Sequence, residues 1–198
     1  MRRPEVPTGH VRRVYLADAN VLYSRILRDY LLYSVRAKLI SVAWSQAILD
    51  EVTEHLIANR INFTQDSADR LVRAMNGTFP YAQHDPDENH YQAFAGIELP
   101  DEDDRHVIAA ALAADAPFIC TNNVRDFPPD VLVRLGLAVV TPDDLLSQLV
   151  REHPASMLWV HRTSIENLRG ATDRSTLAAL RRAAATRTAN LMEQMVVE

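Results

Sequence analysis

Apolar residues along this chain occur either in short continuous runs or in longer stretches with helical spacing. The short runs predict buried strands, and they cover residues 14–17, 39–42, 79–82, 118–121 and 137–140. The longer stretches predict amphipathic helices, over residues 19–37, 45–57, 65–75, 88–95, 103–114, 131–135 and 143–152. Strands that alternate with helices at this spacing predict an α/β fold with a mainly parallel central sheet.

The pattern changes at both ends of this region. Residues 1–12 are polar and predict an irregular lead-in. Beyond Pro154 no further strand-like run is evident, and the apolar positions predict two helices over residues 157–166 and 172–195. We therefore expect three parts, namely a lead-in at 1–12, an α/β domain at 13–153 and a helical extension at 154–198.

The length of 198 residues suits one domain with a short appendage. The formal net charge is −5, and it is unevenly spread. Residues 1–150 carry 14 basic against 21 acidic residues, whereas residues 151–198 carry 7 against 5. This balance excludes a basic protein that coats nucleic acid by bulk charge, although it allows a nucleic-acid enzyme that brings its own cations.

Cysteine content and hydropathy restrict the setting. Cys120 is the only cysteine, which excludes an intramolecular disulfide and a cysteine-rich zinc cluster. No apolar run is long enough for a transmembrane helix, and the N-terminal residues lack the apolar segment of a signal peptide. We therefore expect a cytoplasmic protein without a membrane partner.

Four acidic residues stand at positions where carboxylates are costly. Asp18 directly follows the first predicted strand, and Asp126 lies in the loop after residues 118–121. Glu51 borders the apolar stripe of the second helix, and Asp104 lies in the first turn of a later one. Each has a purely structural alternative, because Asp18 and Asp104 suit helix caps, Asp126 suits a turn, and Glu51 suits a solvated helix face.

Parallel strands bring their carboxyl ends to one edge of the sheet, so we expect Asp18 and the loop 121–126 to lie together there. Like charges at such a site raise one another's pKa and repel. A hard divalent cation such as Mg²⁺ or Mn²⁺ removes that cost, and it suits phosphodiester hydrolysis. Metal chemistry and structural roles both remain open on spacing alone.

Four segments in this order resemble the motifs of a known family. They read LADANVL at residues 16–22, ILDEV at 48–52, LPDEDDRHVIAAA at 99–111 and TNNVRDFP at 121–128. Over residues 13–150 the chain resembles PIN-domain ribonucleases, in particular VapC-type toxins of bacterial type II toxin–antitoxin systems. The helices at 154–198 resemble the extension of a longer subfamily.

The resemblance implies a PIN-like three-layer α/β/α sandwich with added C-terminal helices. It also implies an Mg²⁺- or Mn²⁺-dependent endoribonuclease whose partners are RNA and a cognate antitoxin, and it allows a homodimer. Its metal and catalytic residues map to Asp18, Glu51, Asp104 and Asp126. Supporting positions map to Asn20, Thr121, Asn123, Asp103 and Asp101, of which Asp103 and Asp101 are alternatives to Asp104. Asn123 and Asp126 share the fourth acidic position, where many family members have an acid two residues after the threonine.

Several functional alternatives stay open. A PIN nuclease of RNA processing would have the same site without the toxin role. A non-catalytic binding module is a second alternative, and Asn123 in place of an acid is its only sign. His106 suits an ordinary helix-flank histidine or a phosphate or base contact. The C-terminal helices suit RNA or antitoxin binding, a cover for the sheet edge, or a dimer contact.

Overall fold

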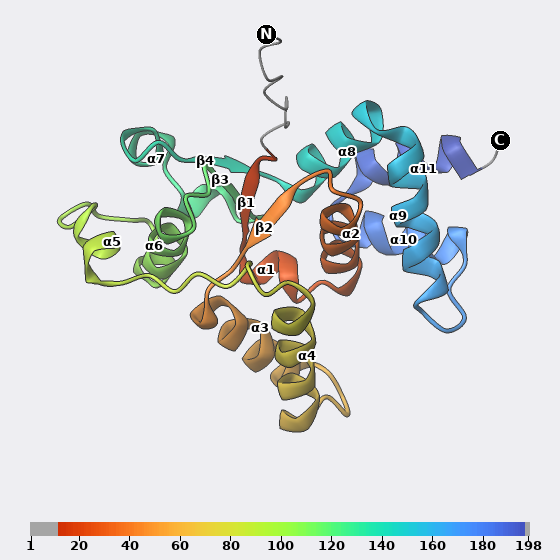
Figure 1. The fold of residues 1–198 in the computed structure, drawn as a ribbon, viewed down its shortest axis with the longest axis horizontal. Helices are drawn as coiled ribbons and strands as arrows, with labels where there is room; N and C mark the ends of the chain where they lie inside the picture. Colours follow the sequence, from red (N-terminus) through yellow and green to blue (C-terminus); the bar gives the residue numbers. More distant parts are fainter. Residues whose placement is uncertain (1–11, 197–198) are drawn as a thin grey trace, which may run out of the picture.

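A four-stranded parallel sheet forms the centre of the molecule (Figure 1). The computed structural model describes residues 12–196, so all but the last residue of the predicted lead-in at 1–12 lies outside the described residues. The strands are β1 (Val14–Ala17), β2 (Ser41–Ala43), β3 (Phe118–Cys120) and β4 (Ala138–Val140), in the order β2-β1-β3-β4. The chain therefore reverses its direction across the sheet between β1 and β3, where α/β folds hold their ligands.

Helices cover both faces of this sheet. On one face α6 (Arg105–Ala113) packs on β1 and β3. On the other, α2 (Arg25–Arg36) packs on β2 and α8 (Pro142–Glu152) packs against α2, as Figure 1 shows. Strands β1, β2 and β3 are buried beyond their first residue because helices cover both faces, whereas the edge strand β4 is partly exposed. The three-layer α/β/α prediction is confirmed.

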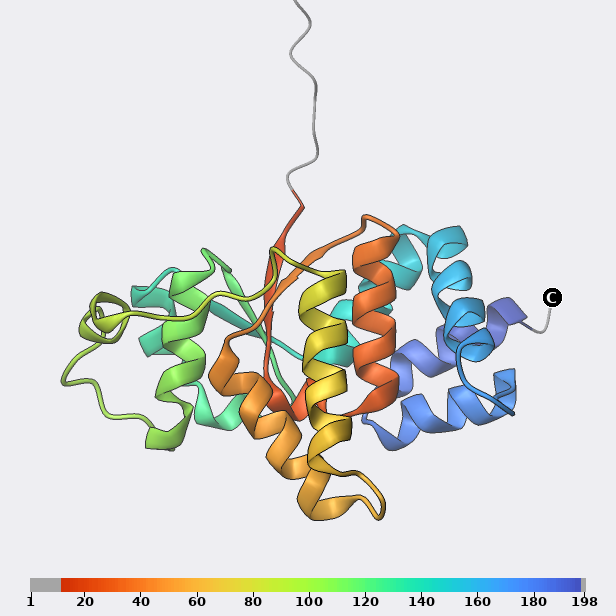
Figure 2. The same cartoon turned by 60° about the horizontal axis from the view of Figure 1, so that its bottom comes forward.

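The other helices of the α/β region lie around the sheet, and three of them are at its carboxyl edge. Short α1 (Ala19–Leu22) follows β1 directly, and α3 (Gln46–Asn59) and α4 (Gln65–Thr78) project beyond that edge in Figures 1 and 2. Ser45 and Thr64 cap α3 and α4 through their hydroxyls. Helix α5 (Glu88–Gln92) lies beside α6, and α7 (Pro129–Arg134) contacts β4.

The C-terminal helices pack on the outer side of α2 and α8, away from the sheet (Figures 1 and 2). They are α9 (Pro154–Glu166), α10 (Asp173–Arg182) and α11 (Thr186–Val196). Met157, Leu180 and Met192 join the same hydrophobic core as the strands. The helices therefore thicken one layer of the sandwich. One alternative from the sequence had them cover a sheet edge, whereas they pack on α2 and α8. The boundary near residue 153 remains a prediction.

Two buried polar contacts fix these helices in place. The Asp143 carboxylate of α8 accepts hydrogen bonds from the backbone amide and hydroxyl of Thr188 at 2.8 Å each, and from Arg187 Nε at 3.0 Å. His161 of α9 contacts the Tyr30 hydroxyl through Nδ1, and its Nε2 lies 2.9 Å from Asp173 Oδ1. Each contact joins the C-terminal helices to the α/β layers or to one another.

Two predicted helices are interrupted. The helix predicted over residues 19–37 ends at Leu22 and restarts at Arg25, because the Arg28 guanidinium donates to the Leu22 carbonyl and closes the first segment. The helix predicted over 172–195 stops near Ala183. There Ala184 adopts a left-handed φ of 60°, and the Ala185 amide donates to the Leu180 carbonyl.

Smaller predictions also shift. No strand forms over residues 79–82, and the neighbouring Gln83 makes an isolated bridge with Trp44. Strand β2 begins at Ser41, two residues later than predicted, because the chain turns through Lys38 at a φ of 63°. The helix predicted over 103–114 begins as a 3₁₀ turn at Glu102–Asp104 before α6.

Candidate metal centre

Asp18 directly follows β1 at the carboxyl edge of the sheet. The residue is buried and only 3% exposed. Its backbone continues the pairing with β3, since its amide donates to the Cys120 carbonyl at 3.1 Å. Its carboxylate caps α1 by accepting from the Ala19 amide at 2.6 Å. The capping role weighed from the sequence is thus real, but it engages Oδ1 and leaves Oδ2 for other contacts.

Asn20 and Thr121 hold the second oxygen of Asp18. The Thr121 hydroxyl lies 2.6 Å from Asp18 Oδ2, and the Asn20 amide nitrogen lies 2.5 Å from the same atom. The Asn122 backbone amide in turn donates to Asn20 Oδ1 at 3.0 Å. Because Asn20 follows β1 and Thr121 follows β3, this network ties the two strand ends together around one carboxylate.

A second group of carboxylates meets at the beginning of α6. Oxygen atoms of Asp101, Asp104 and Asp126 all lie within 4.8 Å of one another. Asp104 stands at the junction of the 3₁₀ turn and α6, and its side chain makes no capping hydrogen bond. Asp104 Oδ2 is buried, and no described residue donates a hydrogen bond to it. A buried carboxylate oxygen without a donor is costly unless a cation binds it.

Electrostatic coupling joins these groups into one site. Loss of hydration, followed by repulsion from Asp18, Asp101, Asp126 and Glu51, raises the pKa of Asp104 to about 6. Burial is also the main cause that raises the pKa of Asp18, and hydrogen bonds from Thr121 and Ala19 partly oppose it. The four acids proposed from the sequence therefore lie within electrostatic reach of each other.

Glu51 and His106 lie at the rim of this group. The Glu51 side chain of α3 is half exposed, and burial and the charge of Asp18 raise its pKa. His106 Nε2 lies 3.7 Å from Glu51 Oε2, while its Nδ1 lies 2.7 Å from the Asp103 carbonyl oxygen. That carbonyl can only accept, so Nδ1 carries a proton and Nε2 faces the acids. His106 therefore belongs to the site region, a placement that the sequence left open.

The supporting acids and amides divide by position. Asp101 lies with Asp104 and Asp126, and its carboxylate also accepts from the Asp103 amide at 3.0 Å. Asp103 itself is exposed, and its backbone carbonyl is what contacts His106. The Asn123 side-chain amide donates to Asp126, so the two residues that share the fourth acidic position lie in contact.

The donor set fits a hard divalent cation. Several carboxylate oxygens converge, one of them lacks any donor, and mutual repulsion already shifts their pKa values. Mg²⁺ and Mn²⁺ prefer such oxygen ligands, and no thiolate or imidazole cluster favours a softer metal among residues 12–196. This fit rests on the residues alone.

Comparison with known proteins agrees with the fold. A family model described as the PIN domain matches residues 14–125, which is more than half of the chain. No curated protein and no solved structure gives a match. The matched segment contains strands β1, β2 and β3. It also contains every acid of the carboxylate site except Asp126, which lies one residue beyond it. The chain therefore belongs to the PIN-domain family.

Proposed function

We propose that this protein is a divalent-metal-dependent endoribonuclease that hydrolyses RNA phosphodiester bonds. Membership of the PIN-domain family indicates a nuclease-type function. The observation that carries the proposal is the meeting of Asp101, Asp104 and Asp126 beside buried Asp18, with Asp104 Oδ2 lacking a donor. Converging carboxylates repel one another without a cation. A divalent cation at this position would remove that repulsion and would suit phosphodiester hydrolysis.

In this proposal Asp18, Glu51, Asp104 and Asp126 hold Mg²⁺ or Mn²⁺, and Asp101 lies close enough to contribute. These residues would hold the cation, and its chemistry when bound would be to lower the pKa of a water ligand and to offset the charge of a phosphodiester. Asn20 and Thr121 hold the Asp18 carboxylate in one orientation, as second contacts of metal ligands do.

Among residues 12–196, neither the Cys120 thiol nor the Thr121 hydroxyl is placed to act as a covalent nucleophile. Cys120 is fully buried in the core, and burial raises the pKa of its thiol. The Thr121 hydroxyl is buried and lies in contact with Asp18, Asn20 and Asn123. We therefore expect direct attack by water without a phosphoryl-enzyme intermediate, and a trapped covalent adduct would contradict this.

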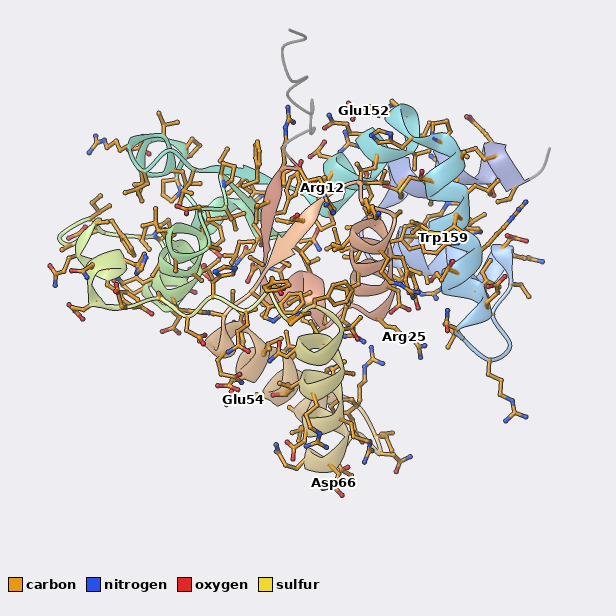
Figure 3. All side chains as sticks on the ribbon, in the orientation of Figure 1. Arg12, Arg25, Glu54, Asp66, Glu152 and Trp159 are labelled. Atoms are coloured by element: carbon orange, nitrogen blue, oxygen red, sulfur yellow. The ribbon has the colours of Figure 1, made fainter. Side chains whose placement is uncertain are left out.

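An RNA cleavage assay with Mn²⁺ or Mg²⁺ tests the nuclease proposal. We expect Asp18→Ala and Asp104→Ala to lose cleavage, because each removes a proposed metal ligand. Asp66→Ala serves as the matched control, since Asp66 is an exposed acid in the first turn of α4, at the outer end of that helix in Figure 3. Equal cleavage by the wild type and both site variants would sink the assignment, and absence of divalent-ion binding would favour a non-catalytic module.

We further propose that the nuclease acts in the cytoplasm as the toxin of a type II toxin–antitoxin system. The support is the resemblance of the four motifs to VapC-type toxins. No helix formed by residues 12–196 has the length and apolar character needed to cross a membrane. Homodimer formation stays a prediction of the resemblance.

Growth arrest on expression tests the toxin role. We expect the wild type to arrest growth, Asp104→Ala not to, and co-expression of the product of an adjacent small reading frame to restore growth. Metal-dependent RNA cleavage without growth arrest would instead place the protein among PIN nucleases of RNA processing.

A further inference from the structure

A groove of about 580 Å³ runs from the residues that hold the Asp18 carboxylate to the C-terminal helices. Asn20 and Asn122 line its inner end, and these are the residues that join the ends of β1 and β3 around Asp18. Helices α9 and α10 line its outer end with hydroxyl side chains. A volume of this size holds a ligand of nucleotide dimensions. The groove therefore connects the proposed catalytic edge to the C-terminal extension.

Three arginines from distant segments line this groove. They are Arg25 at the beginning of α2, Arg60 directly after α3, and Arg182 at the end of α10. Figure 3 shows Arg25 at the end of α2 that lies toward the C-terminal helices. The charges of Arg25 and Arg60 contribute to a lowered pKa of the neighbouring Arg28, which is lowered mainly by burial. The guanidinium groups on this wall are thus close enough to repel.

The positive charge of the groove is incompletely neutralised. Asp29 is the one acidic residue among those that line it, and it pairs with Arg25 at 3.4 Å. No residue of the described range 12–196 forms an ion pair with Arg60 or Arg182. With one acidic residue and three arginines in its lining, the groove carries a net positive charge. Arginine presents a planar donor fork that matches phosphate oxygens.

An aromatic surface accompanies these cations. Tyr23 lines the groove, and its ring stacks on His55 with centroids 4.2 Å apart and planes 23° apart. Tyr23 is partly exposed where it lines the groove, and His55 supports its ring. Flat aromatic rings beside a cationic groove are the features by which proteins hold single strands, because unpaired bases stack on them.

We infer that this groove binds the backbone of single-stranded RNA next to the scissile phosphate, with phosphates on Arg60 and Arg182 and a base on Tyr23. The inference rests on the proposed ribonuclease function and gives that function its substrate form. Duplex RNA fits less well, because its bases are paired and cannot reach the Tyr23 ring. The C-terminal extension then contributes directly to substrate binding through Arg182.

Binding without cleavage provides the test. Fluorescence anisotropy of a labelled oligo-uridylate of about ten nucleotides is measured in EDTA with the full chain, so that no cation supports turnover. We expect Arg60→Glu and Arg182→Glu each to weaken binding roughly tenfold. Each should also reduce the slope of log affinity against log salt by about 0.7. Arg134→Glu on α7 is the matched control, because it makes the same charge change on an exposed site outside the groove.

Tyr23 supplies an independent arm of the test. We expect Tyr23→Ala to weaken binding of the oligo-uridylate roughly five- to a hundredfold, whereas Tyr23→Phe keeps the ring and the affinity. A duplex RNA of equal length should bind more weakly than the single strand and should not respond to Tyr23→Ala. Circular dichroism confirms that each variant is folded.

The results separate this inference from the proposed function. If both arginine variants bind the oligo-uridylate as Arg134→Glu does, the groove inference is wrong. The inference is also wrong if the duplex binds as tightly as the single strand. It is wrong as well if the arginine variants keep their affinity for the oligo-uridylate and lose only the ability to be inhibited by a protein partner. Cleavage by the wild type that depends on Asp104 would leave the ribonuclease proposal standing in each of these cases. Conversely, arginine-dependent binding without any metal-dependent cleavage would refute the ribonuclease proposal alone.

Discussion

Replacing Asp104 by asparagine should make the cation-free protein more stable while it abolishes metal binding. The Asp104 carboxylate is partly buried near four other acids, and its Oδ2 lacks a donor among the described residues. Asparagine has nearly the same shape but carries no charge, so the variant escapes both the desolvation cost and the repulsion. A site built for a cation should be strained when the cation is absent.

The magnitude follows from the pKa of Asp104, which rises from 3.8 to about 6 on folding. A shift of this size corresponds to about 3 kcal/mol at full value, and solvent screening at a partly exposed group reduces it to about 1–2 kcal/mol. Between these two pKa values the folded state binds more protons than the unfolded state. Wild-type stability should therefore fall as pH rises from 3.8 to about 6 and stay lower above it, and the variant should lack this component.

Thermal unfolding in EDTA, at a pH above the folded-state pKa of about 6, measures this difference. We expect Asp104→Asn to melt about 2–8 °C higher than the wild type. Asp66→Asn on α4 is the control, and it should show no gain because that carboxylate is exposed. Mn²⁺ at a hundredfold excess over its dissociation constant should stabilise the wild type by about 2.7 kcal/mol and leave Asp104→Asn unchanged. A variant that melts below the wild type in EDTA, or that gains equally from Mn²⁺, would refute the reasoning.

Three further substitutions address other parts of the structure. Thr121→Val removes the hydroxyl that lies 2.6 Å from Asp18 Oδ2, and calorimetry should show Mn²⁺ affinity about 10–100-fold weaker, whereas equal affinity would exclude the positioning role. Tyr30→Phe leaves buried His161 Nδ1 without its partner, and urea unfolding should show a loss of about 1–3 kcal/mol, with no loss if the contact is dispensable. Ala184→Gly relieves a left-handed alanine, and the same measurement should show a gain of about 1 kcal/mol, while a loss would contradict the assigned φ of 60°.

The sheet and the positions of the acids were predictable because the signals for them are local. A buried strand shows as a short apolar run, and the residue directly after it must lie at the carboxyl edge. Asp18 and Thr121 could therefore be placed together from the sequence, and their contact at 2.6 Å agrees with that. The identity of the bound cation and the role of each acid remain predictions.

Tertiary contacts decided the features that the sequence did not reveal. The break after Leu22 depends on the Arg28 guanidinium, whose reach across the loop leaves no mark in the hydrophobic pattern. Ala184 adopts the left-handed conformation after α10, at a position where glycine is the usual stop signal. The hydrophobic pattern therefore predicted one continuous helix over residues 172–195. The groove is the clearest case, because Arg25, Arg60 and Arg182 come from segments far apart in sequence and no motif links them.

The position of Arg182 explains why the C-terminal extension should be tested by substitution and not by deletion. Helices α9–α11 cover the outer sides of α2 and α8 and share their core, with Met157, Leu180 and Met192 fully or almost fully buried. Removing them would expose the apolar faces of α2 and α8, at about 1.5–3 kcal/mol for each large side chain, and would leave Tyr30 and Asp143 without their partners. A truncated chain would therefore lose activity through unfolding, whatever the extension binds. Arg182 is exposed at the end of α10, so its reversal to glutamate changes the charge of the groove while the packing that positions it stays intact.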